Sequence, residues 1–355
     1  MKKVVYIFAA MLTSSFAIAQ EEEVSVSPAT TFAGSADAYY KYDFAKQMNG
    51  LTSFTNSQDS FELGMASIEA SHTFGKASVF VDLGFGKRAG EFSYNETTDK
   101  DINAKFLIKQ LYFTYQISEE FKVVAGSFGT HIGYELVDAV DNKNYSMSYA
   151  FSYGPFFNTG IKAQYTSGKF TAMLGITNPT DFKSAMDAGT KQKTYVGQIG
   201  YVGETGSAYL NFTTGSGNPA FDDNKTQFDF VASKTITDAF SLGFNATYAK
   251  TKNDFDSELD GDWFSVIGYA SYAFKPSLSL AYRAEYFDGK DAIGLGTLDG
   301  SSVFANTISL NYKVGKLTII PELRYDAASE DIFLDTDSAP AGGSFFGLLA
   351  TTYSF

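Results

Sequence analysis

Hydrophobic and polar residues alternate one by one along most of this chain, a period of two that is typical of β-strands with two different faces. The last segment places on one face Phe345, Gly347, Leu349, Thr351, Tyr353 and Phe355. The first places on one face Phe32, Gly34, Ala36, Ala38, Tyr40, Tyr42 and Phe44, opposite Asp37, Lys41 and Asp43. The pattern predicts about 16 strands, over residues 32–44, 61–72, 77–85, 107–117, 121–130, 157–165, 170–176, 195–201, 208–212, 228–232, 242–248, 264–274, 278–286, 304–312, 317–326 and 345–355. The alternation is less regular in 61–72, where a bulge is expected.

Short turns and long polar loops connect these segments in alternation, as in bacterial outer-membrane barrels. The longest loop runs from His131 to Gly154. An even number of strands places both termini at the short-turn end, so we expect the long loops to face outside the cell.

A closed barrel in a membrane explains the alternation better than a soluble β-sandwich does. Beyond the N-terminus, no run approaches the roughly 18 to 20 apolar residues of a membrane helix. In hydrocarbon every backbone amide must be paired, so a sheet survives there only when it closes on itself. A sandwich would not need aromatic residues at strand ends, where this chain has Tyr42, Phe44, Tyr165, Tyr201, Tyr286, Tyr312, Tyr325 and Tyr353. We predict an all-β fold, a transmembrane antiparallel β-barrel.

The N-terminus carries the features of a cleaved secretory signal. Lys2 and Lys3 precede a largely apolar run over residues 4–16, and the small-residue pattern Ala17-Ile18-Ala19 follows. We predict a signal peptide over 1–19, a short periplasmic segment over 20–31 and the barrel over 32–355. The expected location is the outer membrane of a Gram-negative bacterium.

Composition and charge narrow the possible partners. Cysteine is absent, so disulfides and thiol chemistry are excluded. Without Lys2 and Lys3, 25 basic and 40 acidic side chains remain, a net charge of −15. Nucleic acid is therefore not an expected partner, because phosphate binding needs a basic surface. The acidic excess favours a mild preference for cations in a channel.

One block in the middle of the chain resembles the OmpL-like β-barrel porin family. It consists of Gly126-Ser127-Phe128-Gly129-Thr130-His131-Ile132-Gly133-Tyr134-Glu135, then Asn144-Tyr145-Ser146 and Phe151-Ser152-Tyr153-Gly154-Pro155-Phe156. The opening Gly34-Ser35-Ala36-Asp37-Ala38-Tyr39-Tyr40 and the late Pro321-Glu322-Leu323-Arg324-Tyr325 are similar to that family too. The resemblance spans most of the predicted mature chain. It implies an outer-membrane channel without catalytic residues.

A barrel of this size encloses a water-filled lumen, so we expect its function to depend on inward-facing polar residues. The predicted pore-lining residues are Asp37, Lys41, Asp43, Asp82, Lys162, Arg283, Glu285, Glu322, Arg324 and Asp326. Acidic and basic groups on opposite walls would filter ions by charge. Alternatively, Arg283 with Glu285, and Arg324 with Glu322 and Asp326, form ion pairs that stiffen the wall.

The loop from His131 to Gly154 is too long for a passive connection. We expect it to fold inward as a constriction loop, by analogy with general porins, through Tyr134, Glu135, Asp138, Asp141, Lys143 and Tyr145. The alternative is a surface loop packed on the rim.

The sequence predicts a porin for passive diffusion of small hydrophilic solutes or ions, without a cofactor or metal and without enzymatic activity. His131 lies close in sequence to Ser127 and Thr130, yet no nucleophile motif is legible. The competing functions are a non-conducting barrel that acts as an adhesin or structural protein and, less favoured, a lipid hydrolase. Expected partners are outer-membrane lipids and lipopolysaccharide, the barrel assembly machinery through the Phe355 strand, small polar solutes and a second copy of the chain in a homo-oligomer.

Overall fold

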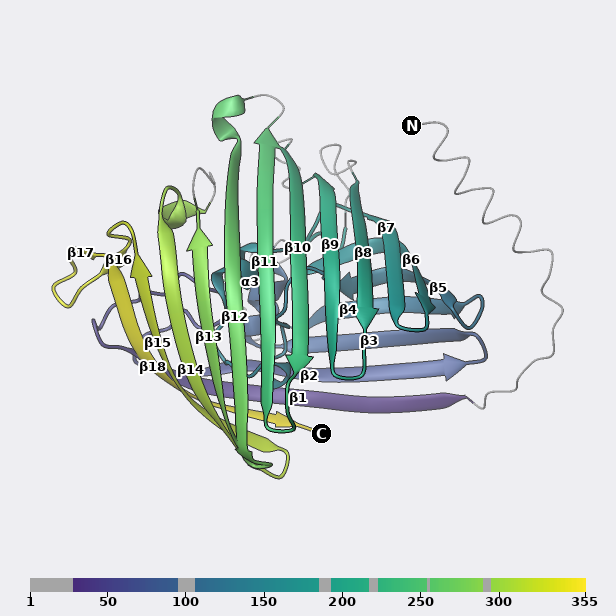
Figure 1. Cartoon of the computed structure of the whole chain (residues 1–355), viewed down its shortest axis with the longest axis horizontal. Coiled ribbons are helices and arrows are strands. Elements are labelled where there is room, and N and C mark those ends of the chain that lie inside the picture. The colour runs from purple at the N-terminus through teal and green to yellow at the C-terminus, as the bar shows by residue number, and fades with distance from the viewer. Residues whose placement is uncertain (1–27, 95–105, 185–192, 217–222, 254–255, 290–294) are drawn as a thin grey trace.

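The computed structural model describes residues 28–94, 106–184, 193–216, 223–253, 256–289 and 295–355. Within them, sixteen antiparallel strands close into a barrel (Figure 1). Each strand pairs with its neighbours in the sequence, and β1 pairs with β18. The strands are β1 (Ala29–Asp43), β2 (Ser60–Phe74), β3 (Ala77–Phe85), β4 (Phe106–Gln116), β5 (Phe121–Gly129), β6 (Phe157–Ser167), β7 (Phe170–Thr177), β8 (Thr194–Val202), β9 (Gly206–Ser216), β10 (Asp223–Thr235), β11 (Phe240–Asn253), β12 (Gly261–Lys275), β13 (Leu278–Asp288), β14 (Ser302–Val314), β15 (Leu317–Ala328) and β18 (Gly343–Ser354). The predicted antiparallel barrel of about 16 strands is confirmed.

The long connections carry the remaining elements. They are α2 (Lys87–Phe92), η3 (Ala139–Asp141), α3 (Tyr149–Tyr153), η5 (Ser257–Leu259), η6 (Gly296–Leu298) and the small hairpin of β16 (Phe333–Leu334) and β17 (Pro340–Ala341). Within the described part of the chain, no helix has the length and apolar character to cross a membrane. The predicted signal peptide and residues 20–27 lie outside the described residues, and β1 begins three residues before the predicted start of the barrel.

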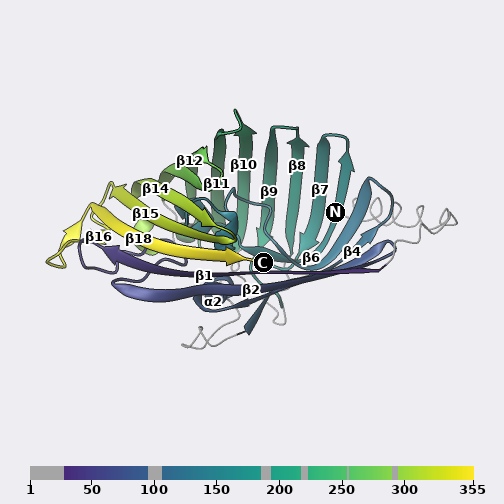
Figure 2. The ribbon, with the colours of Figure 1, turned by 90° about the horizontal axis from the view of Figure 1, so that it is seen from below.

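The ring closes through the last residue of the chain. The Gly34 amide donates to the Phe355 carbonyl over 3.2 Å, and the Phe355 amide donates back to the Gly34 carbonyl over 3.0 Å. Figure 2 shows β1 and β18 side by side at this seam. The expected bulge in the second strand is confirmed, because the β1–β2 register shifts between Ala36 and Ala38.

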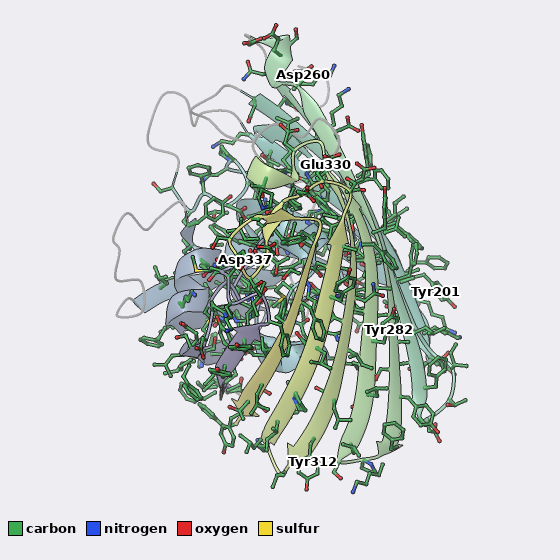
Figure 3. All side chains as sticks on the ribbon, turned by 90° about the vertical axis from the view of Figure 1, so that its left-hand side faces the viewer. Tyr201, Asp260, Tyr282, Tyr312, Glu330 and Asp337 are labelled. Atoms are coloured by element: carbon green, nitrogen blue, oxygen red, sulfur yellow. The ribbon has the colours of Figure 1, made fainter. Side chains whose placement is uncertain are left out.

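The two faces of the wall differ as the alternation predicts. Arg324 is 1% exposed, whereas its neighbours Leu323 and Tyr325 are 47% and 49% exposed on the outer face. Figure 3 shows Tyr201, Tyr282 and Tyr312 on that outer face, and Asp260 and Glu330 at the long-loop end. An apolar outer face suits lipid, while the polar inner face provides the candidate functional site.

Candidate functional site in the barrel lumen

The connection between β5 and β6, residues 130–156, lies inside the barrel and is called the lumen loop. In Figure 1 its helix α3 lies within the ring of strands, and it packs on β12 and β13. The side chain of Ser148 caps this helix by accepting a hydrogen bond from the Phe151 amide over 3.1 Å. Polar side chains of several strands of the wall hold the loop in place.

Two carboxylates of the wall bind backbone amides of the lumen loop. Glu322 accepts hydrogen bonds from the amides of Tyr145 and Ser146 over 2.6 and 3.1 Å. Glu285 accepts from the amides of Tyr149 and Ala150, each over 2.8 Å. Both carboxylates are buried, and hydrogen bonds to charged acceptors are the strong ones. They therefore fasten the loop to β13 and β15.

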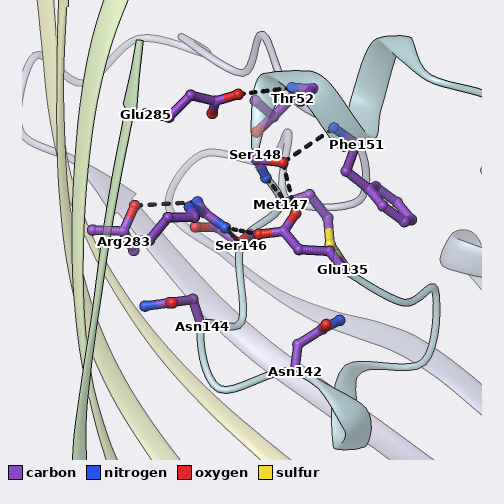
Figure 4. Close-up of polar contacts among 12 residues, drawn as sticks. Thr52, Glu135, Asn142, Asn144, Ser146, Met147, Ser148, Phe151, Arg283 and Glu285 are labelled. Carbon is purple, nitrogen blue, oxygen red and sulfur yellow. Dashed lines mark hydrogen bonds and ion pairs between the residues drawn. The ribbon is translucent and has the colours of Figure 1, made fainter. Parts of the chain in front are cut away.

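Two arginines complete this attachment, as Figure 4 shows for Arg283. Arg283 pairs with Glu135 over 2.5 Å and donates to the Ser146 carbonyl over 2.6 Å. Arg324 pairs with Asp326 over 2.7 Å and donates to the Met147 carbonyl over 2.7 Å. Of the ion pairs considered from the sequence, Arg324 with Asp326 is present, whereas Arg324 with Glu322 and Arg283 with Glu285 are wrong. Arg283 pairs with the loop because Glu285 is engaged by the α3 amides.

On the opposite wall, a buried lysine holds another part of the lumen loop. Lys109 of β4 lies 2.8 Å from Asp138 of the loop and 3.0 Å from Asp82 of β3. Strict alternation assigns Gln110 to the lumen and Lys109 to the lipid face. The β3–β4 register shifts between Asp82 and Leu83, which turns Lys109 inward. A bulge of this kind leaves no clear signal in a single sequence.

Arg88 of α2 is a second site residue that the sequence did not reveal. Its guanidinium is buried, lies 3.7 Å from Asp37 and donates to the Val137 carbonyl of the loop over 3.2 Å. Asp37 also accepts from the Tyr145 hydroxyl over 2.7 Å. The position of Arg88 follows from the inward turn of the β3–β4 connection, which no local pattern predicts.

Apolar side chains from three connections pack together beside these charges. Phe54 follows β1, Phe92 lies in α2, and Met147 and Phe151 belong to the lumen loop. They are buried with Phe156 and Phe157, and burying such side chains stabilises by about 1.5 to 3 kcal/mol each. The connections at the long-loop end are therefore a packed assembly within the barrel.

The predicted pore-lining residues all face the lumen, yet most are covered by the connections. The buried ones are Lys41, Asp43, Asp82, Arg283, Glu285, Glu322, Arg324 and Asp326. Lys41 donates to the Thr55 carbonyl over 3.0 Å, and Asp43 accepts from the Ser344 hydroxyl over 2.8 Å. The Asp37 side chain is also buried, at 4% exposure, whereas Lys162 is partly exposed. Whether these groups filter ions stays a prediction.

The predicted constriction residues divide into two groups. Glu135, Asp138 and Tyr145 are buried against the wall through the contacts above. The others, Tyr134, Asp141 and Lys143, line a cavity between the loop and the wall. Their effect on passage also stays a prediction.

The two histidines are placed in structural positions. The ring Nε2 of His131 lies 3.0 Å from the Phe212 carbonyl, and burial lowers the pKa of His131 to about 4. His72 is exposed and lies 2.8 Å from the Thr30 hydroxyl. Within the described residues, no group of three or more metal-ligating side chains lies together.

A buried carboxyl in the connection between β7 and β8 binds the end of the lumen loop and gives stability a dependence on pH. Asp181 accepts from the Phe156 and Phe157 amides over 2.7 and 2.9 Å, and burial raises its pKa from 3.8 to about 6. The folded state then holds the proton more tightly than the unfolded state does. The contribution of Asp181 to the free energy of unfolding should therefore fall by roughly 1 to 3 kcal/mol as pH rises from 4 to 7.

Denaturant unfolding at several pH values tests this dependence, with Asp181→Asn as the variant that removes the titrating group. His131 contributes the opposite sign, because its lowered pKa favours the folded state as pH rises. The difference between wild type and Asp181→Asn isolates the Asp181 contribution. A difference that does not change between pH 4 and 7 would contradict the prediction.

Comparison with known proteins assigns the chain to a family. The family model described as "Putative beta-barrel porin-2, OmpL-like" matches residues 29–355. The chain belongs to this family. Its members are outer-membrane barrels of the porin type, so the expected location in the outer membrane and the resemblance seen in the sequence are confirmed. A comparison with curated proteins finds no significant match.

Several solved barrels share the fold of this family member. An anion-selective porin from Comamonas acidovorans superposes with a TM-score of 0.63 at 13% identity, covering 93% of this chain and 100% of that one. OmpT of Vibrio cholerae gives 0.60 at 12% identity, covering 94% and 100%. A trimer form of in-vitro folded OmpT from Vibrio cholerae gives 0.61 at 11% identity, covering 93% and 100%. Identities this low show a common fold alone.

Proposed function

We propose that this barrel is a diffusion porin, which lets small hydrophilic solutes or ions pass through its lumen beside the lumen loop. The observation that carries the proposal is a partly exposed polar wall at β6 and β8. Lys162, Gln164 and Gln198 face the lumen there and are reached by solvent. Partly exposed polar side chains on an inner wall are typical of an aqueous passage.

One observation favours the alternative of a non-conducting barrel. The lumen loop is bound to Lys109 on β4 and to Glu285 on β13. In the ring these strands are separated by six strands on one side and eight on the other, so the loop reaches from wall to wall. A barrel crossed in this way can act as an adhesin or as a structural protein.

Planar-bilayer recording of the refolded full chain decides between the two functions. Stepwise ohmic conductance supports the porin, and solute-dependent swelling of liposomes would extend the result to uncharged molecules. Silence under conditions in which a control porin opens would overturn the proposal and support the non-conducting barrel.

Lys162 is the side chain that we expect to govern ion preference. Its ammonium lies 3.9 Å from the centre of the Phe128 ring, and within the described residues no carboxylate lies at ion-pair distance. An unpaired lumenal cation attracts anions and repels cations. This local charge opposes the mild cation preference that the net charge favours.

Lys162→Met should therefore lower the ratio of anion to cation permeability by roughly two- to threefold. Reversal potentials in a salt gradient measure that ratio. The matched control is Lys234→Met, which removes an exposed lysine that donates to Thr205 near a short turn. Equal reversal potentials in wild type and Lys162→Met would show that this wall does not line the ion path.

The remaining sequence predictions belong to the same proposal. Residues 1–19 are cleaved during export, and Phe355 on the closing strand presents the signal for barrel assembly. Outer-membrane lipids and lipopolysaccharide surround the aromatic outer face, and copies of the chain associate as a homo-oligomer. The passage involves no cofactor and no covalent step.

A further inference from the structure

Two lysines are neighbours on the inner wall formed by β5 and β6. In the register of these strands, Lys122 pairs with Gln164, which lies two residues beyond Lys162 on the same face. The two lysines are therefore diagonal partners, and such positions lie about 7 to 8 Å apart in an antiparallel pair. Both lysines are partly exposed, so a solute in the lumen reaches them.

Within the described residues, neither lysine has a counter-ion. No carboxylate there lies at ion-pair distance from Lys122 or Lys162, and the charge that acts on Lys162 is the repulsion from Lys122. Glu120, in the short turn before β5, accepts hydrogen bonds from the Tyr165 and Ser167 hydroxyls instead. Two like charges side by side in a partly covered wall favour the binding of an anion.

The surrounding wall positions Lys162 and provides an amide that is available to a ligand. Gly175 of β7 is the direct partner of Lys162, and a Cβ on Gly175 would lie 2.9 Å from the Lys162 Cβ. The lysine side chain occupies the room that this glycine leaves. The partly exposed Gln164 amide has no hydrogen-bond partner among the described residues, whereas Gln198 donates to Asn211 over 2.8 Å.

Two ammonium groups and one amide match a small anion that carries two charges. A dianion neutralises both lysines at once, whereas a monovalent anion leaves one of them unpaired. Ammonium groups bind phosphate-type oxygens through charge-assisted hydrogen bonds. The Gln164 side chain adds a donor for a further oxygen and an acceptor for a hydroxyl of the anion. A neutral solute would leave both charges unpaired, and a cation would be repelled.

We propose that Lys122, Lys162 and Gln164 form a binding subsite for a small oxyanion with two negative charges, of the phosphate or sulfate type. The two lysines bind oxygens of the anion, and the Gln164 amide donates to another. As a stage in passage, the subsite rests on the proposed diffusion function; as a binding site, it does not. It adds to the expected effect of Lys162 on ion preference a second cation and a preference for divalent over monovalent anions.

Phosphorus NMR of inorganic phosphate tests the proposal, with the refolded full chain in micelles of an uncharged detergent that contains no phosphate. In a mildly alkaline buffer, where phosphate carries two charges, wild type should broaden the phosphate line. Sulfate should displace phosphate more effectively than chloride at the same ionic strength. Lys122→Met should weaken phosphate binding by about tenfold, the loss of one charge-assisted hydrogen bond.

Lys313→Met is the matched control, because Lys313 is an exposed lysine on the inner face of β14, far from β5 and β6 in the ring. Heat-dependent electrophoretic mobility shows whether each variant is folded. If Lys122→Met does not fold, Lys162→Met takes its place in the comparison.

Equal weakening in Lys122→Met and Lys313→Met would show a diffuse attraction of anions to the lumen and overturn the proposal. It is also overturned if wild type binds no phosphate, or if chloride displaces phosphate as well as sulfate does. Phosphate binding in micelles without conductance in bilayers would overturn the porin and leave the subsite standing. Conductance without phosphate binding would do the reverse.

Discussion

Exchanging Glu285 and Glu322 together for glutamine should release the lumen loop and raise single-channel conductance. Each carboxylate accepts two backbone amides of the loop, and a glutamine of the same size offers a single acceptor oxygen. A buried donor without a partner costs about 1 to 3 kcal/mol, so two such losses weaken the attachment considerably. We expect conductance to rise on the order of twofold, as the loop leaves part of the cross-section.

Bilayer recording of the double variant measures the conductance, and limited proteolysis of residues 130–156 reports release of the loop independently. Glu330→Gln is the matched control, since Glu330 is an exposed acidic residue at the long-loop end. Release of the loop without a change in conductance would show that the lumen loop does not restrict the passage. Protection equal to that of wild type would show that the two carboxylates do not hold it.

Replacing Lys109 by methionine should give the largest loss of stability among single changes in the lumen. Its ammonium lies between Asp82 and Asp138, and the lysine side chain is fully buried. Removing the cation leaves two carboxylates facing each other away from water, which costs about 3 to 5 kcal/mol. The loss should diminish at acidic pH, because protonated carboxyls do not need the cation.

Urea unfolding of the refolded barrel measures this loss. Lys87→Met is the matched control, because Lys87 forms a partly exposed pair with Glu62 at 3.9 Å. A pair of that kind contributes about 1 kcal/mol or less. Similar losses in the two variants would contradict the view that the buried Lys109 cluster anchors the loop.

Most charged residues of the lumen wall are bound to the connections, so the net charge of the chain does not by itself predict ion preference. Most acidic groups of the lumen accept hydrogen bonds from the lumen loop or pair with a buried cation. They are not available to attract cations in a passage. We therefore expect ion preference to depend on the few unpaired groups, with Lys162 foremost.

The sequence by itself determined the barrel. Apolar and polar residues alternate along segments that are long enough, as strands, to cross a membrane. This alternation alone indicates which residues of a strand lie on its outer face. For this reason Leu323, Arg324 and Tyr325 could be assigned to their faces in advance, as could the closing strand that ends at Phe355. The inward folding of the long loop could be proposed only from its length.

The tertiary structure decided which groups meet inside the barrel. Lys109 faces the lumen because of a bulge, and Arg88 reaches Asp37 because a connection turns inward. Arg283 pairs with a residue 148 positions away in the sequence instead of its near neighbour Glu285. These contacts depend on distances across the ring and on competition for backbone amides. A local pattern of alternating residues carries no information about either.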